Sequence, residues 1–360
     1  MAQIAVLAGD GIGPEVTAAA QRVLAAVLPE IAFVPTPVGA AAIASHGTAL
    51  PDETLALCDA SDAILFGAVG GSFANISPEK RPEAGLLRLR KHFGLFANVR
   101  PARVYPGLES LSPLRDHLAR GVDMVIVREL TGGLYFGQKS LERENGVMTA
   151  RETLTYNENE IARVVRFAFE LARQRRGKLT SVDKANVMIS SQLWHRVVDD
   201  IAGEFPDVTV SHLLVDNAAM QLVRVPAQFD VIVTENMFGD ILSDEAAMLT
   251  GSIGTAPSAS LTTTSGGRAF GLYEPIAGTA PDIAGRDIAN PVGAILSAAM
   301  LCRFSLGDAA AANQITRAVG ETLAAGPYTA DLAAPGTTAV GTRAFTDAVL
   351  ERLGKLAVAG

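Results

Sequence analysis

Two aspartates, Asp240 and Asp244, stand four residues apart in a stretch whose apolar residues have helical spacing. On a helix this spacing places both carboxylates on one face, with their Cβ atoms about 5–6 Å apart. Such like charges repel unless a cation lies between them, and their hard oxygen atoms suit Mg²⁺ or Mn²⁺. Helix capping with a solvated acidic face explains the pair equally well. Asp216, which follows a predicted strand, is a further acidic candidate that spacing alone cannot assign to the same site.

Three arginines could bind the carboxylates of a ligand. Arg90 lies in an apolar helical stretch, Arg100 closes an apolar run, and Arg128 ends the predicted strand 124–127. A guanidinium group binds a carboxylate with two parallel hydrogen bonds, a geometry that lysine cannot copy. Arginines directly after strands are also well placed, because open α/β sheets bind ligands at the carboxyl ends of their strands. Ordinary surface salt bridges are the alternative.

A lysine and a tyrosine could transfer protons. Lys184 follows the predicted strand 179–182, where a lysine can act as a base, form a Schiff base or remain a solvated cation. Tyr135 is flanked by glycines and is either the partner acid or a packed aromatic ring with an exposed hydroxyl. The five histidines show no metal-ligand spacing such as HExxH, and we expect His195, beside Trp194, to be structural.

The glycine-rich segment 9–14 lies between a predicted strand and a predicted helix. It begins like a dinucleotide fingerprint, but Pro14 stands where GxGxxG requires its third glycine. Because proline suits the first turn of a helix, the sequence favours a structural turn over a Rossmann phosphate loop.

The elements that must position these residues alternate between strands and helices, which predicts an α/β fold with helices packed on a central sheet. The predicted strands are 3–7, 32–38, 63–66, 124–127, 179–182, 208–214 and 231–234. The predicted helices are 15–27, 158–175, 191–204, 241–248, 291–306, 308–325 and 342–356. Asn157 and Glu160 have the spacing of a capping box at one helix start.

Two regions break this alternation. Residues 252–267 are rich in Ser, Thr and Gly, and we expect a loop or crossover connection there. Residues 132–155 are polar and contain glycine. They could form a loose surface loop or an extended arm that pairs with another subunit.

The size and composition indicate a soluble protein with two lobes. The chain has 360 residues, more than a single core usually supports. Its net charge of −8 argues against nucleic acid or an anionic membrane as a partner. Cys58 and Cys302 stand outside any CxxC pattern, so we expect no disulfide framework and a reducing, cytoplasmic location. We find neither a signal-peptide pattern nor an apolar run long enough to span a membrane.

Together these segments resemble the isocitrate/isopropylmalate dehydrogenase family of β-hydroxyacid oxidative decarboxylases. The resemblance follows the family's order over nearly the whole chain, in residues 9–14, 86–90, 95–101, 127–133, 182–187, 215–221, 239–245, 257–261 and 274–291. It implies an α/β, two-lobed fold with a continuous central sheet, not a Rossmann fold. It also implies a cofactor-side domain of residues 1–100 and 251–360. Residues 101–250 would then form the domain for metal, substrate and dimerisation, with an arm at about 132–155.

The resemblance also implies roles for the candidate residues. Those that would clamp the substrate carboxylates are Arg90, Arg100 and Arg128. Those that would bind Mg²⁺ or Mn²⁺ are Asp216, Asp240 and Asp244, with Asp216 also touching the substrate. Tyr135 and Lys184 would be the catalytic acid–base pair. Lys184 and Asp216 would come from the neighbouring subunit, which makes the protein a homodimer with shared active sites.

The resemblance places NAD on a loop near the end of the chain instead of on the N-terminal glycines. The residues that would bind it are Ile12, Gly71, Glu83, Glu274, Gly278, Thr279, Ala280, Pro281, Asp282, Ile283 and Asn290, with the loop 71–83 completing the site. The Asp282 carboxylate could accept hydrogen bonds from a ribose diol and would repel a 2′-phosphate, which favours NAD over NADP. The chain departs from the usual pattern at Ala277, where many relatives have His, and at residues 255–256, which replace a bulkier pair.

Two leucines indicate the substrate. Leu86 and Leu87, with Val187 from the neighbouring subunit, would form an apolar pocket for an isopropyl group, whereas relatives that act on isocitrate have polar residues here. Helix core is the alternative for one of the leucines. We therefore expect NAD- and metal-dependent oxidative decarboxylation of 3-isopropylmalate to 4-methyl-2-oxopentanoate in leucine biosynthesis. The alternatives are a related D-malate, tartrate or homoisocitrate dehydrogenase, a Mg²⁺-dependent lyase or phosphotransferase, and a catalytically silent binding protein.

Overall fold

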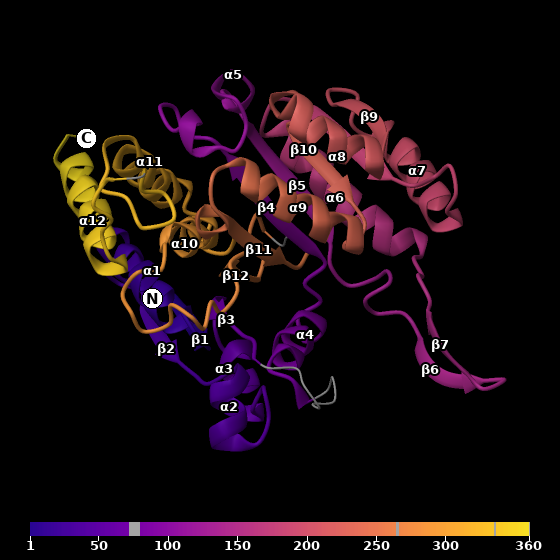
Figure 1. The fold of residues 1–360 in the computed structure, drawn as a ribbon, viewed down its shortest axis with the longest axis horizontal. Helices are drawn as coiled ribbons and strands as arrows, with labels where there is room; N and C mark the ends of the chain where they lie inside the picture. Colours follow the sequence, from indigo (N-terminus) through magenta and orange to yellow (C-terminus); the bar gives the residue numbers. More distant parts are fainter. Residues whose placement is uncertain (72–79, 264–265, 335, 360) are drawn as a thin grey trace.

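The computed structural model describes residues 1–71, 80–263, 266–334 and 336–359. A single ten-stranded sheet runs through these residues (Figure 1). In order across the sheet, the strands are β2 (Ala32–Pro35), β1 (Gln3–Gly9), β3 (Ala63–Ala68), β12 (Gly271–Pro275), β11 (Pro257–Leu261), β4 (Ala97–Arg103), β5 (Asp123–Glu129), β10 (Val231–Thr234), β8 (Lys178–Asp183) and β9 (Thr209–Leu214). The strands pair in parallel at both ends of the sheet and antiparallel where β12, β11, β4 and β5 meet. The sheet confirms the predicted α/β class and continuous sheet.

Helices cover both faces of this sheet (Figure 1). They are α1 (Gly13–Val27), α2 (Gly39–His46), α3 (Asp52–Asp59), α4 (Glu83–His92), α5 (Asp116–Ala119), α6 (Glu158–Arg173), α7 (Ile189–Ala202), α8 (Val215–Arg224), α9 (Asn236–Leu249), α10 (Val292–Phe304), α11 (Ala309–Ala325) and α12 (Thr342–Ala359). In the described ranges, no helix is long and apolar enough to cross a membrane.

The two faces of the sheet are packed differently. On one face a single apolar core extends under α1, α10, α6 and α7, and includes strand residues such as Leu65, Val99 and Val127. On the other face there are two separate cores. One lies between α8, α9 and the half of the sheet that contains Ile126, and the other lies between α3, α4 and the half that contains Phe66. Each large apolar side chain buried in this way contributes about 1.5–3 kcal/mol. The stretch of sheet between the two separate cores is where polar side chains gather.

Most predicted elements form within a few residues of their expected bounds. All seven predicted strands are present, but the one expected at 32–38 ends at Pro35, because Pro35 and Pro37 cannot donate to a sheet ladder. The capping box at Asn157 and Glu160 is confirmed, since each side chain accepts a hydrogen bond from the other residue's backbone N–H. The helix expected at 241–248 begins earlier, at Asn236, because the Glu235 side chain accepts a hydrogen bond from the Phe238 N–H and caps it.

The prediction of a loop at residues 252–267 was wrong in part. Residues Pro257–Leu261 form β11, a buried strand in the middle of the sheet, and β4 and β12 beside it were also not among the predicted strands. The sequence of β11 is proline, serine and alanine before its final leucine, so neither apolar alternation nor β-branched residues marked it. Hydrogen bonding compensates: the Asn98 side chain of β4 donates to the Ser258 and Ser260 hydroxyls of β11 at 2.8 and 3.1 Å.

Residues 132–155 contain an extended hairpin and not a loose loop. Strands β6 (Lys139–Glu144) and β7 (Val147–Glu152) pair antiparallel, separate from the main sheet. Their turn is Asn145 and Gly146, both with positive φ, as a two-residue hairpin turn requires. Figure 1 shows the hairpin extending away from the body of the molecule. Its apolar side chains Leu141 and Val147 are exposed.

Candidate active site

A strip of buried polar side chains lies on the sheet between the two separate cores. On each of the middle strands, one set of alternate residues belongs to the continuous core of the opposite face, as Val99 does on β4 and Val127 on β5. The other set therefore points to the strip. Its members are Asn98, Arg100, Arg128, Ser258, Ser260 and Glu274, all buried. Arg100 and Arg128 lie inside β4 and β5, and not after the strands as the sequence suggested.

Helix α9 brings its two aspartates against these arginines. Arg128 Nη1 forms a short hydrogen bond with Asp240 Oδ1, and Arg100 Nη1 lies 3.1 Å from Asp244 Oδ1 and 3.5 Å from Asp240 Oδ1. The prediction that Asp240 and Asp244 lie on one face of a helix is therefore confirmed. We refer to Arg100, Arg128, Asp240 and Asp244 as the α9 cluster.

Two further α9 residues in this contact were not predicted. Ser243 Oγ accepts a hydrogen bond from Arg100 at 2.7 Å, and Asn236 Oδ1 accepts one from Arg128 Nε at 2.9 Å. Had the helix been predicted to begin at Asn236, positions 236, 240, 243 and 244 would have fallen on one helical face. The missing signal was the N-cap, because Glu is not among the common N-cap residues.

The three arginines of the predicted clamp are brought together, and their charges repel. Burial lowers the pKa of Arg100, and Arg90 beside it lowers that pKa further, while Asp240 and Asp244 oppose the shift. Burial and the neighbouring Arg100 lower the pKa of Arg128 to about 10. Arg90 is held by Glu274 of β12 at 2.9 Å. An accumulation of buried cations of this kind is suited to an anionic ligand.

Two donors of this clamp are buried and unpaired among the described residues. They are the Nε–H groups of Arg90 and Arg100. A buried donor without an acceptor costs about 1–3 kcal/mol, more when the group is charged. Carboxylate oxygens of a ligand would remove that cost by accepting charge-assisted hydrogen bonds.

Tyr135 joins the α9 cluster as a donor. Its hydroxyl donates to Asp240 Oδ2 at 3.0 Å, and the Arg128 guanidinium lies 5.7 Å from the centre of its ring. Partial burial, and then the Asp240 carboxylate, raise the pKa of the phenol above its usual value. Tyr135 therefore keeps its proton near neutral pH and can donate it.

Lys184 and Asp216 form a pair of their own. Lys184, directly after β8, lies 2.5 Å from Asp216 in the first turn of α8, and this hydrogen bond lowers the Asp216 pKa. In the part of the chain that the structure describes, no hydrogen bond or ion pair joins either residue to the α9 cluster. Val187, three residues after Lys184, is exposed. The predicted site residues therefore form two separate groups within the described part of one chain.

The two leucines of the predicted pocket differ in burial. Leu86 is partly buried and packs against the core under α4, so the alternative of helix core applies to part of its surface. Leu87 is exposed. Because Leu86 and Leu87 precede Arg90 by four and three residues on α4, both lie near the face that carries Arg90.

The N-terminal glycine turn supports the predicted cofactor loop. The backbone N–H of Ile12 donates to the Thr279 carbonyl at 2.9 Å, and a Cβ on Gly11 would lie 2.0 Å from that oxygen, so only glycine fits. Ile12 itself is buried in the core, and Asp282 is exposed. Glu83 Oε2 is buried without a hydrogen-bond partner among the described residues, as an acceptor for a bound ligand's donors would be. Of the predicted loop 71–83, residues 72–79 lie outside the described residues.

Asn290 of the predicted cofactor site is held by a residue that the sequence reasoning missed. Asp331 Oδ2 accepts hydrogen bonds from Asn290 Nδ2 at 2.9 Å and from Ser252 Oγ at 2.5 Å. Asp331 Oδ1 accepts a further one from Thr329 at 2.6 Å. This carboxylate thus ties the cofactor loop to the segment that follows α9, and no short-range sequence pattern joins residues so far apart.

Comparison with known proteins gives consistent results. A family model described as isocitrate/isopropylmalate dehydrogenase matches residues 3–349. A 3-isopropylmalate dehydrogenase from Xanthomonas campestris is 53% identical over 98% of this chain and 99% of its own, and one from Moorella thermoacetica is 57% identical over 95% and 96%. A crystal structure of isocitrate dehydrogenase from Methylococcus capsulatus superposes with a TM-score of 0.88 at 35% identity, covering 98% of this chain and 99% of the other.

Proposed function

The chain belongs to the isocitrate/isopropylmalate dehydrogenase family, and on that premise we propose that it oxidises and decarboxylates 3-isopropylmalate to 4-methyl-2-oxopentanoate in leucine biosynthesis. The observation that carries the proposal is the clamp: the Nε–H groups of Arg90 and Arg100 are buried and have no acceptor among the described residues. A dicarboxylic hydroxy acid supplies those acceptors.

The choice of an alkyl-bearing substrate rests on α4. Isocitrate would bring a third carboxylate to the residues that precede Arg90, and this chain has Leu86 and Leu87 there. An unpaired carboxylate against two leucines is costly to desolvate, whereas an isopropyl group gains from apolar contact. The relatives named for 3-isopropylmalate are also more similar in sequence than the isocitrate dehydrogenase of known structure.

The residues present fit a divalent cation and a dinucleotide. Asp240 and Asp244 would contribute hard oxygen ligands on one face of α9, and Asp216 is the proposed third ligand. Residues 278–283 with Asn290, Glu274 and Glu83, whose Oε2 has no partner among the described residues, would hold NAD. When bound, the cation would acidify the substrate's 2-hydroxyl and the nicotinamide would accept the hydride from C2.

The chain's own residues then account for binding and proton transfer. Arg90, Arg100 and Arg128 orient the substrate through its carboxylates, and Lys184 accepts the hydroxyl proton as C2 becomes a ketone. The bond from C3 to its carboxylate breaks, CO₂ leaves, and the electron pair remains on the product as an enolate. Tyr135, which holds its proton against Asp240, protonates C3 to give the 2-oxo acid.

We further propose that two copies of the chain share each site. Asp216 is exposed and Lys184 is partly buried, and neither hydrogen-bonds to the α9 cluster within the described chain, so a second copy is needed to bring such a pair to the clamp. Exposed apolar side chains support a pairing surface: Met220 and Val223 on α8, Ile241 and Met248 on α9, and Leu141 on the hairpin. The two cysteines are buried and unpaired, which supports a cytoplasmic location.

A substrate panel tests the proposed function. Turnover of 3-isopropylmalate, isocitrate, D-malate, tartrate and homoisocitrate is followed by reduced-cofactor absorbance with NAD⁺ or NADP⁺, with and without Mg²⁺. We expect the highest kcat/KM for 3-isopropylmalate with NAD⁺, and no turnover after chelation. Preference for a substrate without the branched alkyl group would overturn the role of the leucines. Metal-dependent substrate loss without cofactor reduction would favour a lyase.

A further inference from the structure

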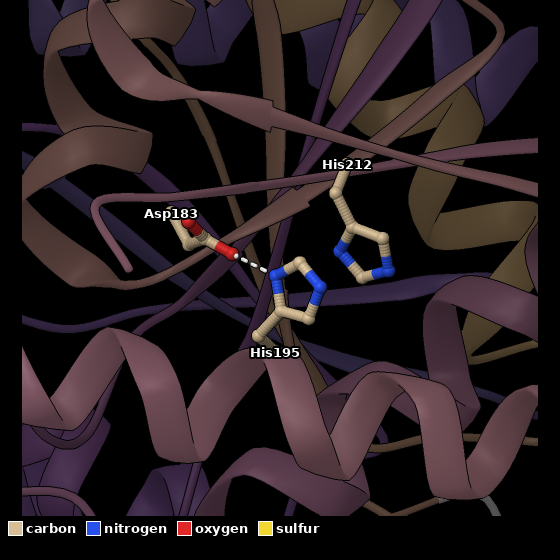
Figure 2. Close-up of side chains that lie close together, drawn as sticks. All are labelled: Asp183, His195 and His212. Atoms are coloured by element: carbon tan, nitrogen blue, oxygen red, sulfur yellow. Dashed lines mark hydrogen bonds and ion pairs between the residues drawn. The ribbon is translucent and has the colours of Figure 1, made fainter. Parts of the chain in front are cut away.

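Two histidines outside the proposed active site lie close together, and the proposed reaction makes no use of them. His195 is on α7 and His212 is on β9, and their rings stack with centroids 3.7 Å apart. Figure 2 shows His195 between the ring of His212 and the carboxylate of Asp183, the last residue of β8. Each of the three offers a potential ligand atom, and these atoms lie within 4.8 Å of one another. Because the residues come from three elements, their sequence spacing could not reveal the group.

Two carboxylates fix which nitrogen of each ring carries a proton. His195 Nδ1 lies 2.9 Å from the buried Asp183 Oδ2, and His212 Nε2 lies 3.0 Å from Asp199 Oδ1. A carboxylate only accepts hydrogen bonds, so both of these nitrogens are the donors. In the neutral rings, His195 Nε2, which lies 3.8 Å from Asp199 Oδ2, and His212 Nδ1 are then left with lone pairs. His212 Nδ1 is buried and has no hydrogen-bond partner among the described residues.

This arrangement is the one that metal-binding imidazoles use. A ligating histidine almost always donates its other ring N–H to a carboxylate or carbonyl, which orients the ring and raises the basicity of the ligating nitrogen. Here both rings already have such a carboxylate. Imidazole nitrogens suit Zn²⁺, Ni²⁺ and Cu²⁺, whereas Mg²⁺ and Mn²⁺ prefer oxygen ligands.

We propose that His195 and His212 form a second cation site, selective for a borderline transition-metal ion such as Zn²⁺, with Asp199 holding the His212 ring and Asp183 orienting the His195 ring while no ion is bound. The lone pair of an imidazole lies in its ring plane, and the rings are now 19° from parallel. One ring must therefore turn for both nitrogens to reach an ion at about 2.0–2.1 Å. His195 is the ring that can turn, because its side chain is 37% exposed against 21% for His212.

Calorimetric titration of the whole protein with ZnCl₂ tests this site, with excess Mg²⁺ present to occupy oxygen-ligand sites. We expect one Zn²⁺ per chain in the unaltered protein. His212→Phe, which keeps a ring in the stack, and His195→Phe should each weaken binding at least tenfold. His92→Phe is the matched control, since His92 also pairs with a carboxylate, that of Asp59, but has no second imidazole in the described chain. It should bind Zn²⁺ normally.

A second measurement needs no variant. Trp194, the single tryptophan, directly precedes His195, so Cu²⁺ bound at this site should quench its fluorescence and Zn²⁺ should reverse the quenching. Equal Zn²⁺ affinity in His212→Phe, displacement of Zn²⁺ by millimolar Mg²⁺, or Cu²⁺ quenching that Zn²⁺ does not reverse would each overturn the proposal. The site is separate from the α9 cluster, so none of these results bears on the proposed dehydrogenase activity.

Discussion

Two charged groups of similar composition, the α9 cluster and the Lys184–Asp216 pair, differ in what surrounds them. In the α9 cluster the Arg128 side chain is 5% exposed and its partner Asp240 is 35% exposed. Lys184 and Asp216 are 25% and 60% exposed. The first group is oriented by strands β4 and β5 and by helix α9, so its geometry is set when the chain folds. The second group is open to solvent at Asp216, and an ion pair with one such exposed partner contributes little. In the proposed function, one chain thus builds a rigid part of a site and presents a separate part to the site of a second copy.

The sharpest test of this division is complementation between inactive variants. Lys184→Met and Asp240→Asn should each lower kcat by about 10²–10⁴-fold, since each removes a proposed proton acceptor or metal ligand. Refolded together, they should recover roughly a quarter of wild-type activity, because a random mixture of symmetric dimers contains one intact site in half of its dimers. The measurement is kcat of the protein refolded from an equal mixture of the two variants.

The control for complementation changes both residues of the Lys184–Asp216 pair, one in each variant. A mixture of Lys184→Met and Asp216→Asn should stay inactive, because both changes damage the part that a chain would lend to its neighbour. Recovery in this control, or none in the first mixture, would contradict shared sites.

The second prediction concerns Arg100, whose replacement should weaken substrate binding far more than it changes the stability of the fold. Arg100→Met should raise the KM for 3-isopropylmalate about 10–100-fold, the value of one charge-assisted hydrogen bond. The free energy of unfolding should change by no more than about 1 kcal/mol, unlike the about 3–5 kcal/mol typical of a broken buried ion pair. The reason is that burial and Arg90 already disfavour the Arg100 charge, while Arg128 still neutralises Asp240.

Urea unfolding without substrate measures the stability of Arg100→Met. Lys184→Met is the comparison variant, because the Lys184 side chain is less buried than that of Arg100. Lys184→Met should change the free energy of unfolding by less than about 0.5 kcal/mol. A loss of several kcal/mol in Arg100→Met would show that the arginines stabilise the fold and are not held ready for a ligand.

The sequence was most informative where one strong local pattern determined the structure. The capping box at Asn157, the strands of the parallel ends of the sheet and the helical pair Asp240 and Asp244 could all be predicted from local spacing. Strand β11 could not, because Pro257, Ser258 and Ser260 give it no apolar alternation, and the Asn98 side chain that bonds its serines comes from another strand. The fold class and the placement of Asp240 and Asp244 on one face of α9 therefore followed from the sequence, while the middle of the sheet did not.

Contacts between residues that are far apart in the sequence could not be predicted. Arg90 and Glu274 are separated by 184 positions, and their contact depends on the order of strands in the sheet. Likewise, nothing near Asn290 in the sequence indicates Asp331. The predicted domain division and the NAD and metal assignments rest on the resemblance to the family and remain predictions.

The smallest expected effect concerns Glu235, which caps α9. Its carboxyl makes the stability of the folded chain depend on pH. Glu235 Oε1 accepts the Phe238 N–H at 2.8 Å, while Oε2 is buried without a partner among the described residues. Burial raises the pKa of this carboxyl, and the hydrogen bonds from the Phe238 and Met237 N–H groups, followed by the Arg128 charge, oppose that rise. A carboxyl with a raised pKa keeps its proton in the folded state at a pH where the unfolded chain has lost it. Stability therefore falls as the pH rises from about 4.3, the usual glutamate pKa, through the folded value.

Glu235→Gln should remove this loss while keeping the cap, because a glutamine oxygen can still accept from Phe238. The variant should match the wild type near pH 4 and be more stable at pH 7 by on the order of 1 kcal/mol, measured by urea unfolding at several pH values. Glu204→Gln is the control of opposite sign, since the Arg166 hydrogen bond lowers the Glu204 pKa. Its contribution is present above the unfolded pKa and is lost as the pH falls through the folded one, so this variant should be the less stable at pH 7. If Glu235→Gln instead lost stability at pH 7, the ionised carboxylate would be an essential part of the cap, and the end of α9 that carries Asp240 would depend on charge and not only on hydrogen-bond geometry.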